Sequence, residues 1–312
     1  MTVGIAAICQ WSGVNMVVGA SDRMLTVDDS AEYEPPTSKI FFLTPRAVAL
    51  IAGDTSSQFT IAIGAQKEIV DRPATDIKDI AAIYAKHFAA HRLKEAEALI
   101  LAPLGLTGDT FLKRQKTMAP DIVRDITYKL LAYELDAEAI IAGMDQAGAH
   151  IYTIRDPGLE TCQDRVGFAA IGIGGPHAES QFMFAKYSPF TWYMPWTLFL
   201  TYFAKKRAEV APGVGQETDM FFIESGTPNA SYLFDQFKQS IDGIYRNMHM
   251  GMDRLLQEGG RLTLEEHQKL RAAEAEKQKA ASAEGETEQS ALTGGVGEGV
   301  EKGQHEDQKP QT

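Results

Sequence analysis

Threonine stands at position 2, directly after Met1, and this position gives it a chemistry that an internal threonine lacks. Met1 precedes a small residue, the kind of start from which the initiator methionine is commonly removed. Removal would leave Thr2 with its hydroxyl and a free α-amine on the same residue. That amine has an ordinary pKa of about 7.7–8.0, close enough to neutrality for it to act as a general base. Threonine is also a common second residue without any chemical role.

The other residues that often carry chemistry show no comparable arrangement. The two cysteines, Cys9 and Cys162, form neither a disulfide framework nor a metal-ligand spacing. The seven histidines also lack metal-ligand spacing, and His177 is expected near a helix start. The glycines of GIGG are an incomplete dinucleotide fingerprint. We therefore expect no cofactor and no metal.

The composition of the chain disfavours two classes of binding partner, nucleic acids and membranes. The net charge of −12 disfavours a general nucleic-acid surface and an anionic membrane. No stretch approaches the ~20 uninterrupted apolar residues that cross a bilayer, and Pro189 and Pro195 break the aromatic segment YSPFTWYMPWTLFLTYF. The apolar N-terminal run has no Lys or Arg before Arg23, unlike a secretory leader. We expect a cytoplasmic protein without nucleic-acid or membrane partners.

Hydrophobic patterning predicts strands and helices in alternating groups. Short apolar runs between turn formers predict strands, and apolar residues at helical spacing predict helices. The expected strands are 3–8, 16–20, 39–43, 47–52, 137–144, 149–154, the segment FAAIGIGG and 218–224. The expected helices are 56–70, 75–101 and 121–134, with an irregular insertion at 103–120 and two helices before the last strand. This order suits an α+β fold in which two helix layers cover two packed antiparallel sheets.

The end of the chain has a different composition. From Gln257 onward there are 12 acidic and 7 basic residues, a net charge of −5, and no Phe, Tyr or Trp follows Tyr245. Such a segment buries too little apolar surface to offset its ordering entropy. Thr263 and Glu266 are spaced as a capping box, which predicts a solvated helix of about 15 residues and then a disordered end. We expect a folded domain at 1–255 and an acidic tail at 256–312.

Seven strings of the sequence resemble, in order, the proteasome superfamily of N-terminal-nucleophile hydrolases. They are TVGI, ASDR, SKIFFL, ALIAGDTSSQ, AIIAGMDQAGAHIYTI, AAIGIGGPHAES and KKRAEVAPGVGQETDMFFI, and they cover about residues 2–223. The resemblance, to β-subunit-like and bacterial proteasome-like members, implies a four-layer αββα sandwich. It also implies assembly into a homo-oligomeric ring.

The resemblance also implies catalytic roles for five residues, the first of which is Thr2 as nucleophile. Lys39 falls at the family's catalytic lysine, a cation that lowers the pKa of the hydroxyl and of the amine. Asp22 matches the aspartate that holds this lysine charged, and Gly53 matches the glycine whose N–H stabilises the oxyanion. Glu209 corresponds to a later aspartate that steadies the threonine amine.

Each of these residues also has a plainer interpretation. Asp22 and Arg23 could form a surface salt bridge, and Lys39 could be a solvated strand end. Gly53 could be only a turn glycine before a helix.

Three features depart from the family pattern. Ile173 stands where the family has a supporting serine, and Pro212 stands where it has a second one; neither side chain carries a hydroxyl. Thr2 also falls two residues after the usual nucleophile, on the same strand face but one pleat deeper. The first hairpin has extra residues between Cys9 and Val14, either in its turn or in a displaced strand.

Three functions remain open at this point. The first is a threonine amidohydrolase that cleaves a peptide or amide substrate through an acyl-enzyme, most naturally a peptidase within a ring. The second is a non-catalytic scaffold similar to a proteasome α-subunit, and the third is a small-molecule amide hydrolase. An aromatic cluster would be an interface or part of the core. It comprises Trp192, Tyr193, Trp196, Phe199 and Phe203.

Overall fold

The structure, a computed structural model, describes residues 2–27, 31–224 and 229–293. The chain forms two compact units, Met1–Gly243 and Ile244–Thr312. The first unit contains every described strand and the helices α1 to α6. Among the described residues, no helix combines the length and the apolar character that crossing a lipid bilayer needs.

The first five-stranded sheet is antiparallel and begins with the N-terminal hairpin. Its strands lie in the order β10 (Phe168–Ile171), β1 (Gly4–Trp11), β2 (Val14–Asp22), β11 (Thr218–Ile223) and β12 (Ser231–Tyr232). The turn of the β1–β2 hairpin contains only two residues, Ser12 and Gly13, with φ values of 50° and 80°. Two positive φ angles are typical of the type I′ turn, whose twist matches that of the strands. The turn is therefore short, and Gln10 and Trp11 belong to β1.

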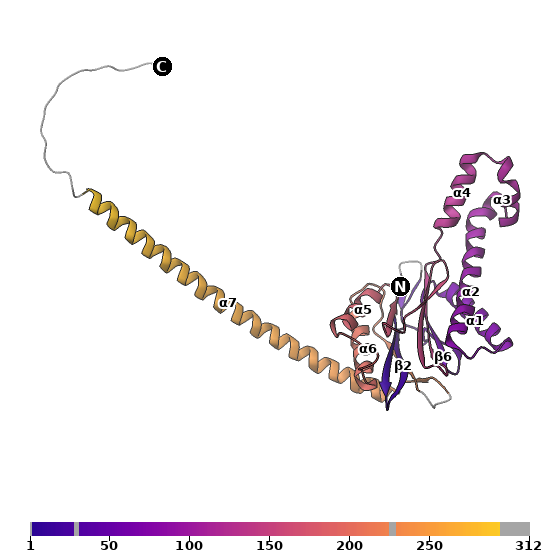
Figure 1. Cartoon of the computed structure of the whole chain (residues 1–312), viewed down its shortest axis with the longest axis horizontal. Helices are drawn as coiled ribbons and strands as arrows, with labels where there is room; N and C mark the ends of the chain where they lie inside the picture. Colours follow the sequence, from indigo (N-terminus) through magenta and orange to yellow (C-terminus); the bar gives the residue numbers. More distant parts are fainter. Residues whose placement is uncertain (1, 28–30, 225–228, 294–312) are drawn as a thin grey trace, which may run out of the picture. The chain divides into compact units, whose positions relative to one another are not determined.

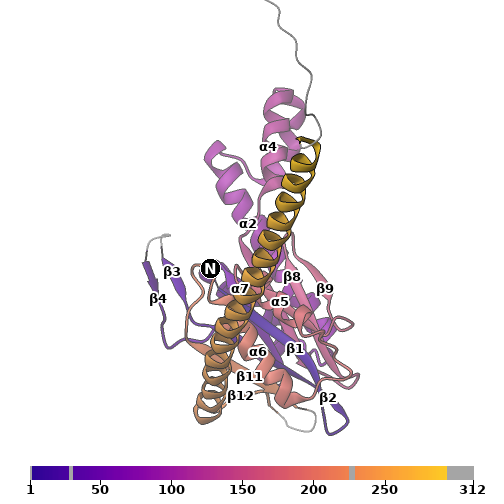
Figure 2. The same cartoon turned by 90° about the vertical axis from the view of Figure 1, so that its left-hand side faces the viewer.

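The second five-stranded sheet is also antiparallel and has a meander order. Its strands are β5 (Ile40–Thr44), β6 (Ala47–Gly53), β7 (Ala137–Met144), β8 (Ala149–Arg155) and β9 (Leu159–Cys162). A separate hairpin of β3 (Leu25–Val27) and β4 (Ala31–Tyr33) lies outside both sheets (Figure 2).

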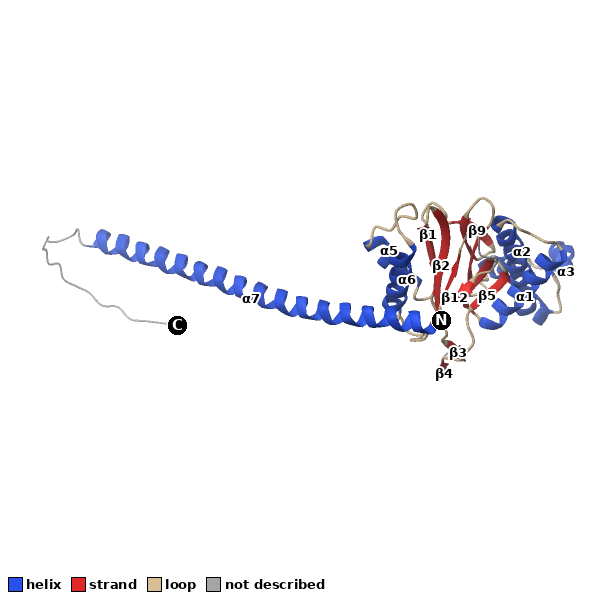
Figure 3. Cartoon of the chain, turned by 90° about the horizontal axis from the view of Figure 1, so that it is seen from below, coloured by secondary structure: helices blue, strands red, loops and turns tan. Residues whose placement is uncertain are grey.

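Helices cover the outer faces of the two sheets, which pack face to face (Figure 3). Helices α1 (Thr55–Asp71) and α2 (Ile77–Ala96) lie on the second sheet, and α5 (Gly175–Phe184) and α6 (Met194–Ala208) lie on the first. Strands between two apolar layers are buried on both faces, which explains why β1, β6 and β7 are continuous apolar runs rather than alternating patterns. The predicted α+β class with two antiparallel sheets is confirmed.

Residues 97–132 form a helical extension at the end of α2, beyond the sheets (Figure 1). Short π and 3-10 segments (Glu97–Leu101 and Ala102–Leu104) lead into α3 (Gly108–Arg114), a 3-10 turn (Gln115–Thr117) and α4 (Pro120–Ala132). The prediction of an irregular segment at 103–120 is wrong for this part. The apolar residues of the segment pack into a small core of their own, comprising Leu101, Leu106, Phe111 and Ile126.

Helix α7 is far longer than the sequence predicts. It runs from Asp235 to Thr293, over 59 residues, instead of about 15 residues from Thr263. Thr263 lies inside the helix, where its Oγ1 donates to the carbonyl of Gly259 at 2.8 Å, so it is not an N-cap. The boundary between the two compact units falls at Gly243, within α7. The part of the expected disordered end at 294–312 lies outside the described residues.

Candidate active site

The structure brings Thr2, Asp22 and Lys39 together from three separate points of the chain. Thr2 lies just before β1, and Asp22 is the last residue of β2, so the antiparallel pairing of these strands places the two side by side. Lys39 lies just before β5 and therefore comes from the opposite sheet. The packing of the two sheets thus completes a cluster that neither sheet contains alone.

The three side chains form one buried polar network. The Thr2 hydroxyl donates to Asp22 Oδ1 and accepts a hydrogen bond from Lys39 Nζ. Lys39 Nζ lies 3.3 Å from Asp22 Oδ1 and 3.4 Å from Oδ2. Thr2 is 1% exposed, Asp22 0% and Lys39 6%. A hydroxyl held between a carboxylate and an ammonium is suited to nucleophilic chemistry, since the cation favours the loss of its proton.

Backbone groups hold the Asp22 carboxylate in one orientation. The N–H of Val3 donates to Oδ1 at 3.0 Å, and the N–H groups of Met24 and Gly215 donate to Oδ2 at 3.1 Å each. These bonds compensate a buried carboxylate for the loss of water. They also leave Oδ1 directed at Thr2.

Burial changes the chemistry of Lys39. Desolvation lowers the pKa of its ammonium below the ordinary 10.5, although the charge of Asp22 and its hydrogen bond act in the opposite direction. Lys39 is therefore a buried side chain rather than a solvated strand end. Asp22 likewise does not pair with Arg23, whose Nε donates to Asp219 Oδ2 at 3.0 Å. The two plainer interpretations of these residues are wrong.

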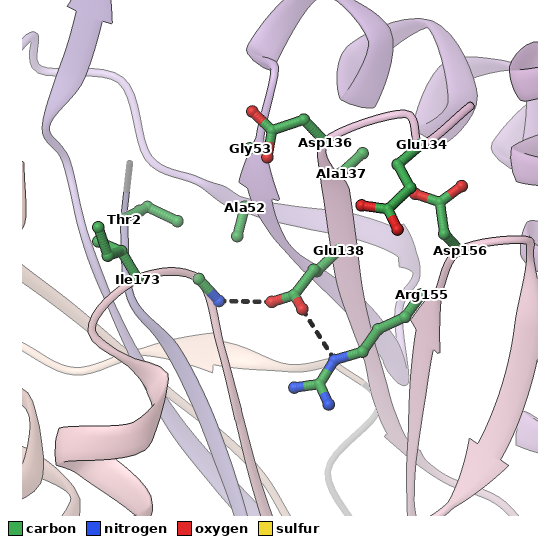
Figure 4. A pocket seen from close by; sticks show the side chains of 11 residues that line it. Thr2, Ala52, Gly53, Glu134, Asp136, Ala137, Glu138, Arg155, Asp156 and Ile173 are labelled. Carbon is green, nitrogen blue, oxygen red and sulfur yellow. Dashed lines mark hydrogen bonds and ion pairs between the residues drawn. The ribbon is translucent and has the colours of Figure 1, made fainter. Parts of the chain in front are cut away.

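A pocket of about 490 Å³ opens beside Thr2 (Figure 4). Its lining comes from the start of β1, the end of β6, the segment at the start of β7, the end of β8 and the loop after β10. The lining residues are Thr2, Ala52, Gly53, Glu134, Asp136, Ala137, Glu138, Arg155, Asp156, Gly172 and Ile173. Thr2 and Gly53, two of the predicted site residues, thus border the same space.

Two glycines of the lining are required by backbone geometry. Gly53 ends β6 with a φ of 94°, and a Cβ added to it would lie 2.0 Å from the carbonyl oxygen of Asp136. Gly172 has a φ of 78°, and a Cβ there would lie 2.4 Å from the carbonyl oxygen of Thr2. Gly53 is therefore a necessary turn glycine, and it also lies at the pocket where an oxyanion donor is expected.

Glu138 and Arg155 order the wall of the pocket opposite Thr2 (Figure 4). Glu138 Oε2 accepts from the N–H of Gly172 at 2.7 Å, and its Oε1 lies 2.9 Å from Arg155 Nε. These bonds connect β7, β8 and the loop after β10. Sequence reasoning missed Glu138; its signal is a carboxylate at the start of the apolar strand AEAIIAGM.

The lining carries four acidic residues and one basic residue. Glu138 is paired with Arg155, and Asp156 accepts from Arg92 Nε at 2.9 Å. The exposed carboxylates of Glu134 and Asp136 have no hydrogen bond or ion pair with any residue that the structure describes. The pocket therefore favours a positively charged ligand group.

The remaining predicted position, Glu209, lies at the end of α6 and binds lysines. Its Oε1 is 2.5 Å from Lys205 Nζ and 2.9 Å from Lys206 Nζ. Glu209 is not among the pocket-lining residues. Ile173, at a position where the resemblance predicts a serine, lines the pocket and is 46% exposed, whereas Pro212 is exposed in the turn after α6.

No group of three or more His, Cys, Asp or Glu side chains within 2–27, 31–224 and 229–293 is arranged to hold a metal ion. The sequence matches none of the protein-family models and none of the curated proteins with which it was compared. The resemblance to proteasome-like hydrolases therefore stays a prediction.

Proposed function

We propose that the protein is an N-terminal threonine amidohydrolase, a peptidase that cleaves its substrate through an acyl-enzyme on Thr2. The observation that supports this most is the contact of the Thr2 hydroxyl with both Asp22 and Lys39 beside the pocket. Two antiparallel sheets between helix layers are also the arrangement expected of an αββα N-terminal-nucleophile hydrolase. A homo-oligomeric ring in the cytoplasm belongs to the same proposal and is based on the resemblance.

The first step forms a bond from Thr2 Oγ1 to the substrate carbonyl carbon. The hydroxyl proton passes to the free α-amine, and the carbonyl electron pair moves onto oxygen. Lys39 stabilises the developing charge on Oγ1, while Asp22 keeps Lys39 charged and oriented. The Gly53 N–H donates to the oxyanion, an interaction that contributes about 3–4 kcal/mol in comparable sites.

The second step breaks the carbon–nitrogen bond of the tetrahedral intermediate. The leaving amine takes the proton from the α-ammonium, and the acyl group remains as an ester on Thr2. Water then attacks the ester carbon while the α-amine takes its proton. The bond from that carbon to Oγ1 breaks, Oγ1 takes the proton back from the α-ammonium, and the carboxylic acid leaves. Thr2 returns to its starting state, so each turnover consumes one amide and one water.

The charge of the pocket indicates the kind of substrate. Glu134 and Asp136 are unpaired within the described chain, so a cationic side chain next to the scissile bond would gain an ion pair there. A substrate with a lysine-like or arginine-like group is therefore the preferred class. A small basic amide would fit the same lining, and a set of peptide and small-amide substrates would separate the peptidase from the small-molecule hydrolase.

The test is intact mass and N-terminal sequencing before and after reaction with a β-lactone that carries a lysine-like side chain. We expect a chain that begins at Thr2 and gains one acyl adduct on that residue. Thr2→Ala should take no adduct, and Thr2→Ser should retain one because it keeps the hydroxyl. A chain that keeps Met1, or an adduct that persists in Thr2→Ala, would contradict the proposal.

The second candidate is a non-catalytic scaffold, and two observations favour it. Ile173 and Pro212 lack the hydroxyls expected near the amine, and the side chain of Thr2 is almost fully buried. A protein that assembles into rings, keeps Met1 and resists the β-lactone would be such a scaffold.

A further inference from the structure

A second buried lysine lies behind Asp22, on helix α6. Lys205 is 0% exposed, and its ammonium has three oxygen partners. Nζ lies 2.5 Å from Glu209 Oε1, 2.8 Å from the carbonyl of Gly215 and 2.9 Å from the carbonyl of Gln216. An ammonium has three N–H donors, so this set satisfies it fully.

The position of Lys205 on the helix explains its burial. It follows Leu198, Thr201 and Tyr202 at helical spacing, and these residues are buried against the first sheet. Lys206, the next residue, is on a more exposed face, with a side chain 17% exposed. Burying a lysine in an apolar face is costly unless its charge is matched, which indicates that this ammonium has a specific task.

The contacts of Gly215 indicate what Lys205 does. Its carbonyl accepts from Lys205 Nζ, and its N–H donates to Asp22 Oδ2 at 3.1 Å. The turn that follows α6 is therefore held from one side by Lys205 and holds Asp22 on the other. A Cβ at Gly215 would lie 1.8 Å from Glu34 Oε1 and 3.0 Å from the Cβ of Met24, so the turn is packed closely against Glu34 and against the residues that follow β2.

We propose that Lys205 is a positioning residue for the Thr2 site and acts through the Gly215 N–H on Asp22. This inference rests on the proposed function of Thr2. With Oδ2 bound to Gly215, the Oδ1 atom of Asp22 remains directed at the Thr2 hydroxyl and at Lys39 Nζ. Glu209 then supports the site by neutralising Lys205, which gives this carboxylate a role without contact to Thr2.

The experiment compares Lys205→Met with Lys206→Met in the full chain. Lys206→Met is the matched control, because Lys206 also binds Glu209 but reaches the turn only through a 3.4 Å contact with the carbonyl of Gln216 and has no hydrogen bond to Gly215. The first readout is the rate constant of Thr2 acylation at saturating lysine-like β-lactone, together with the concentration that gives half the maximal rate. The second readout is hydrogen exchange of the peptide that contains Gly215.

Lys205→Met should lower the saturating rate constant by about 10- to 100-fold, because a displaced catalytic group reacts poorly even when the substrate binds. The half-saturating concentration should stay nearly constant, since Lys205 does not line the pocket. Exchange at Gly215 should become faster, whereas Lys206→Met should change all three quantities much less. If Lys205→Met fails to fold, Glu209→Gln keeps both carbonyl bonds, removes the counter-charge and should lower the same rate constant.

Two results would overturn the inference. One is an unchanged saturating rate constant in a folded Lys205→Met variant, and the other is unchanged exchange at Gly215. If the wild-type chain takes no adduct at all, the proposed function fails, but the exchange measurement still decides whether Lys205 holds the Gly215 N–H on Asp22.

Discussion

Lys39 and Asp22 form a buried ion pair, and their burial determines the protonation state in which Thr2 can react. An ammonium near a hydroxyl favours loss of the hydroxyl proton only while the ammonium itself is charged. Burial lowers the pKa of Lys39, and Asp22 acts against this shift through its charge and hydrogen bond. The activity of Thr2 should therefore depend on two protonation states, that of the α-amine and that of Lys39.

The acylation rate of Thr2 should follow a bell-shaped curve against pH. It should rise as the α-amine loses its proton, near its ordinary pKa of about 7.7–8.0, and fall at a pH below 10.5 as Lys39 loses its own. Lys39→Met should remove the falling limb and lower the maximum by about 10²- to 10⁴-fold. Adduct formation with the β-lactone, followed by mass at a series of pH values, measures this.

The control for this profile is Lys129→Met, which removes an exposed lysine on α4 that pairs with Asp125. That variant should retain the wild-type curve. An alkaline limb that survives in Lys39→Met would assign the limb to another group.

The sequence predicts the residues of the site that stand next to recognisable strings and misses those that act through packing. Thr2, Asp22 and Lys39 each adjoin an apolar strand, and the packing of these strands brings the three together. Lys205 stands in the run Lys-Lys-Arg, which looks like the charged end of a helix. Only its spacing from Leu198 and Tyr202 shows that it lies on the buried face.

At the scale of elements, the β7–β8 hairpin is tied to its surroundings by an ionisable cluster. His150 Nδ1 lies 2.7 Å from Asp164 Oδ2, and its Nε2 lies 3.2 Å from Asp145 Oδ1. Asp145 also accepts from the N–H of Ile77 at the start of α2. Burial acts to lower the pKa of His150, but the hydrogen bond to Asp164 and the two carboxylate charges outweigh it, so the pKa is raised.

The raised pKa predicts a pH-dependent contribution to stability. A histidine with a raised folded-state pKa stabilises the fold fully below its unfolded pKa of about 6.5, and this contribution is lost as the pH rises through the folded value. His150→Gln should reduce the free energy of unfolding at about pH 5.5 by about 1.5–3 kcal/mol, the size of a hydrogen bond to a charged group. The loss should be smaller at about pH 9.

Urea unfolding of His150→Gln and the wild type at both pH values measures this difference. His177→Gln is the control, because it replaces a histidine at the exposed start of α5. An equal loss at both pH values would show that the imidazole contributes by packing alone.

Strands buried on both faces were the easiest elements to predict, because a short continuous apolar run, as in β6 and β7, is compatible with few other secondary structures. Helix α7 was the hardest. In the sequence, its glycines at 243, 251, 259 and 260 suggest interruptions of the helix. Thr263 and Glu266 have the spacing of a capping box, which predicts a helix N-terminus at a position inside α7. Short helices such as α3, which pack into a small core of their own, were also hard to predict. They contain too few apolar residues to show a clear helical periodicity in the sequence.

At the scale of the whole molecule, the helices α5 and α6 and the loop between them carry several large apolar side chains that are more than half exposed. They are Met183 at 64%, Phe184 at 85%, Phe190 at 72%, Tyr193 at 53% and Trp196 at 62%. The aromatic cluster predicted from the sequence is thus divided, since Trp192, Phe199 and Phe203 are half-buried. Exposed aromatic side chains of this number are typical of an interface between subunits.

If the chain forms the proposed homo-oligomer through this surface, Trp196→Glu should weaken its self-association. Loss of a central aromatic contact commonly costs at least about 2 kcal/mol, which is roughly a 30-fold weaker association. Sedimentation velocity over a range of protein concentrations measures this. Tyr128→Glu, at a residue 70% exposed on α4, is the control, and equal effects of the two substitutions would place the interface elsewhere.

The two glycines of the pocket have an evolutionary consequence. Gly53 lies against the carbonyl of Asp136 and Gly172 against that of Thr2, so any side chain at either position collides with backbone. This constraint comes from the architecture and not from the reaction. If the proposed hydrolysis were lost in a relative, selection for the reaction would no longer maintain Thr2 and Lys39, whereas Gly53 and Gly172 would stay under selection. An alignment of relatives in which the glycines persist while the hydroxyl and the ammonium vary would therefore mark the branches where catalysis was lost.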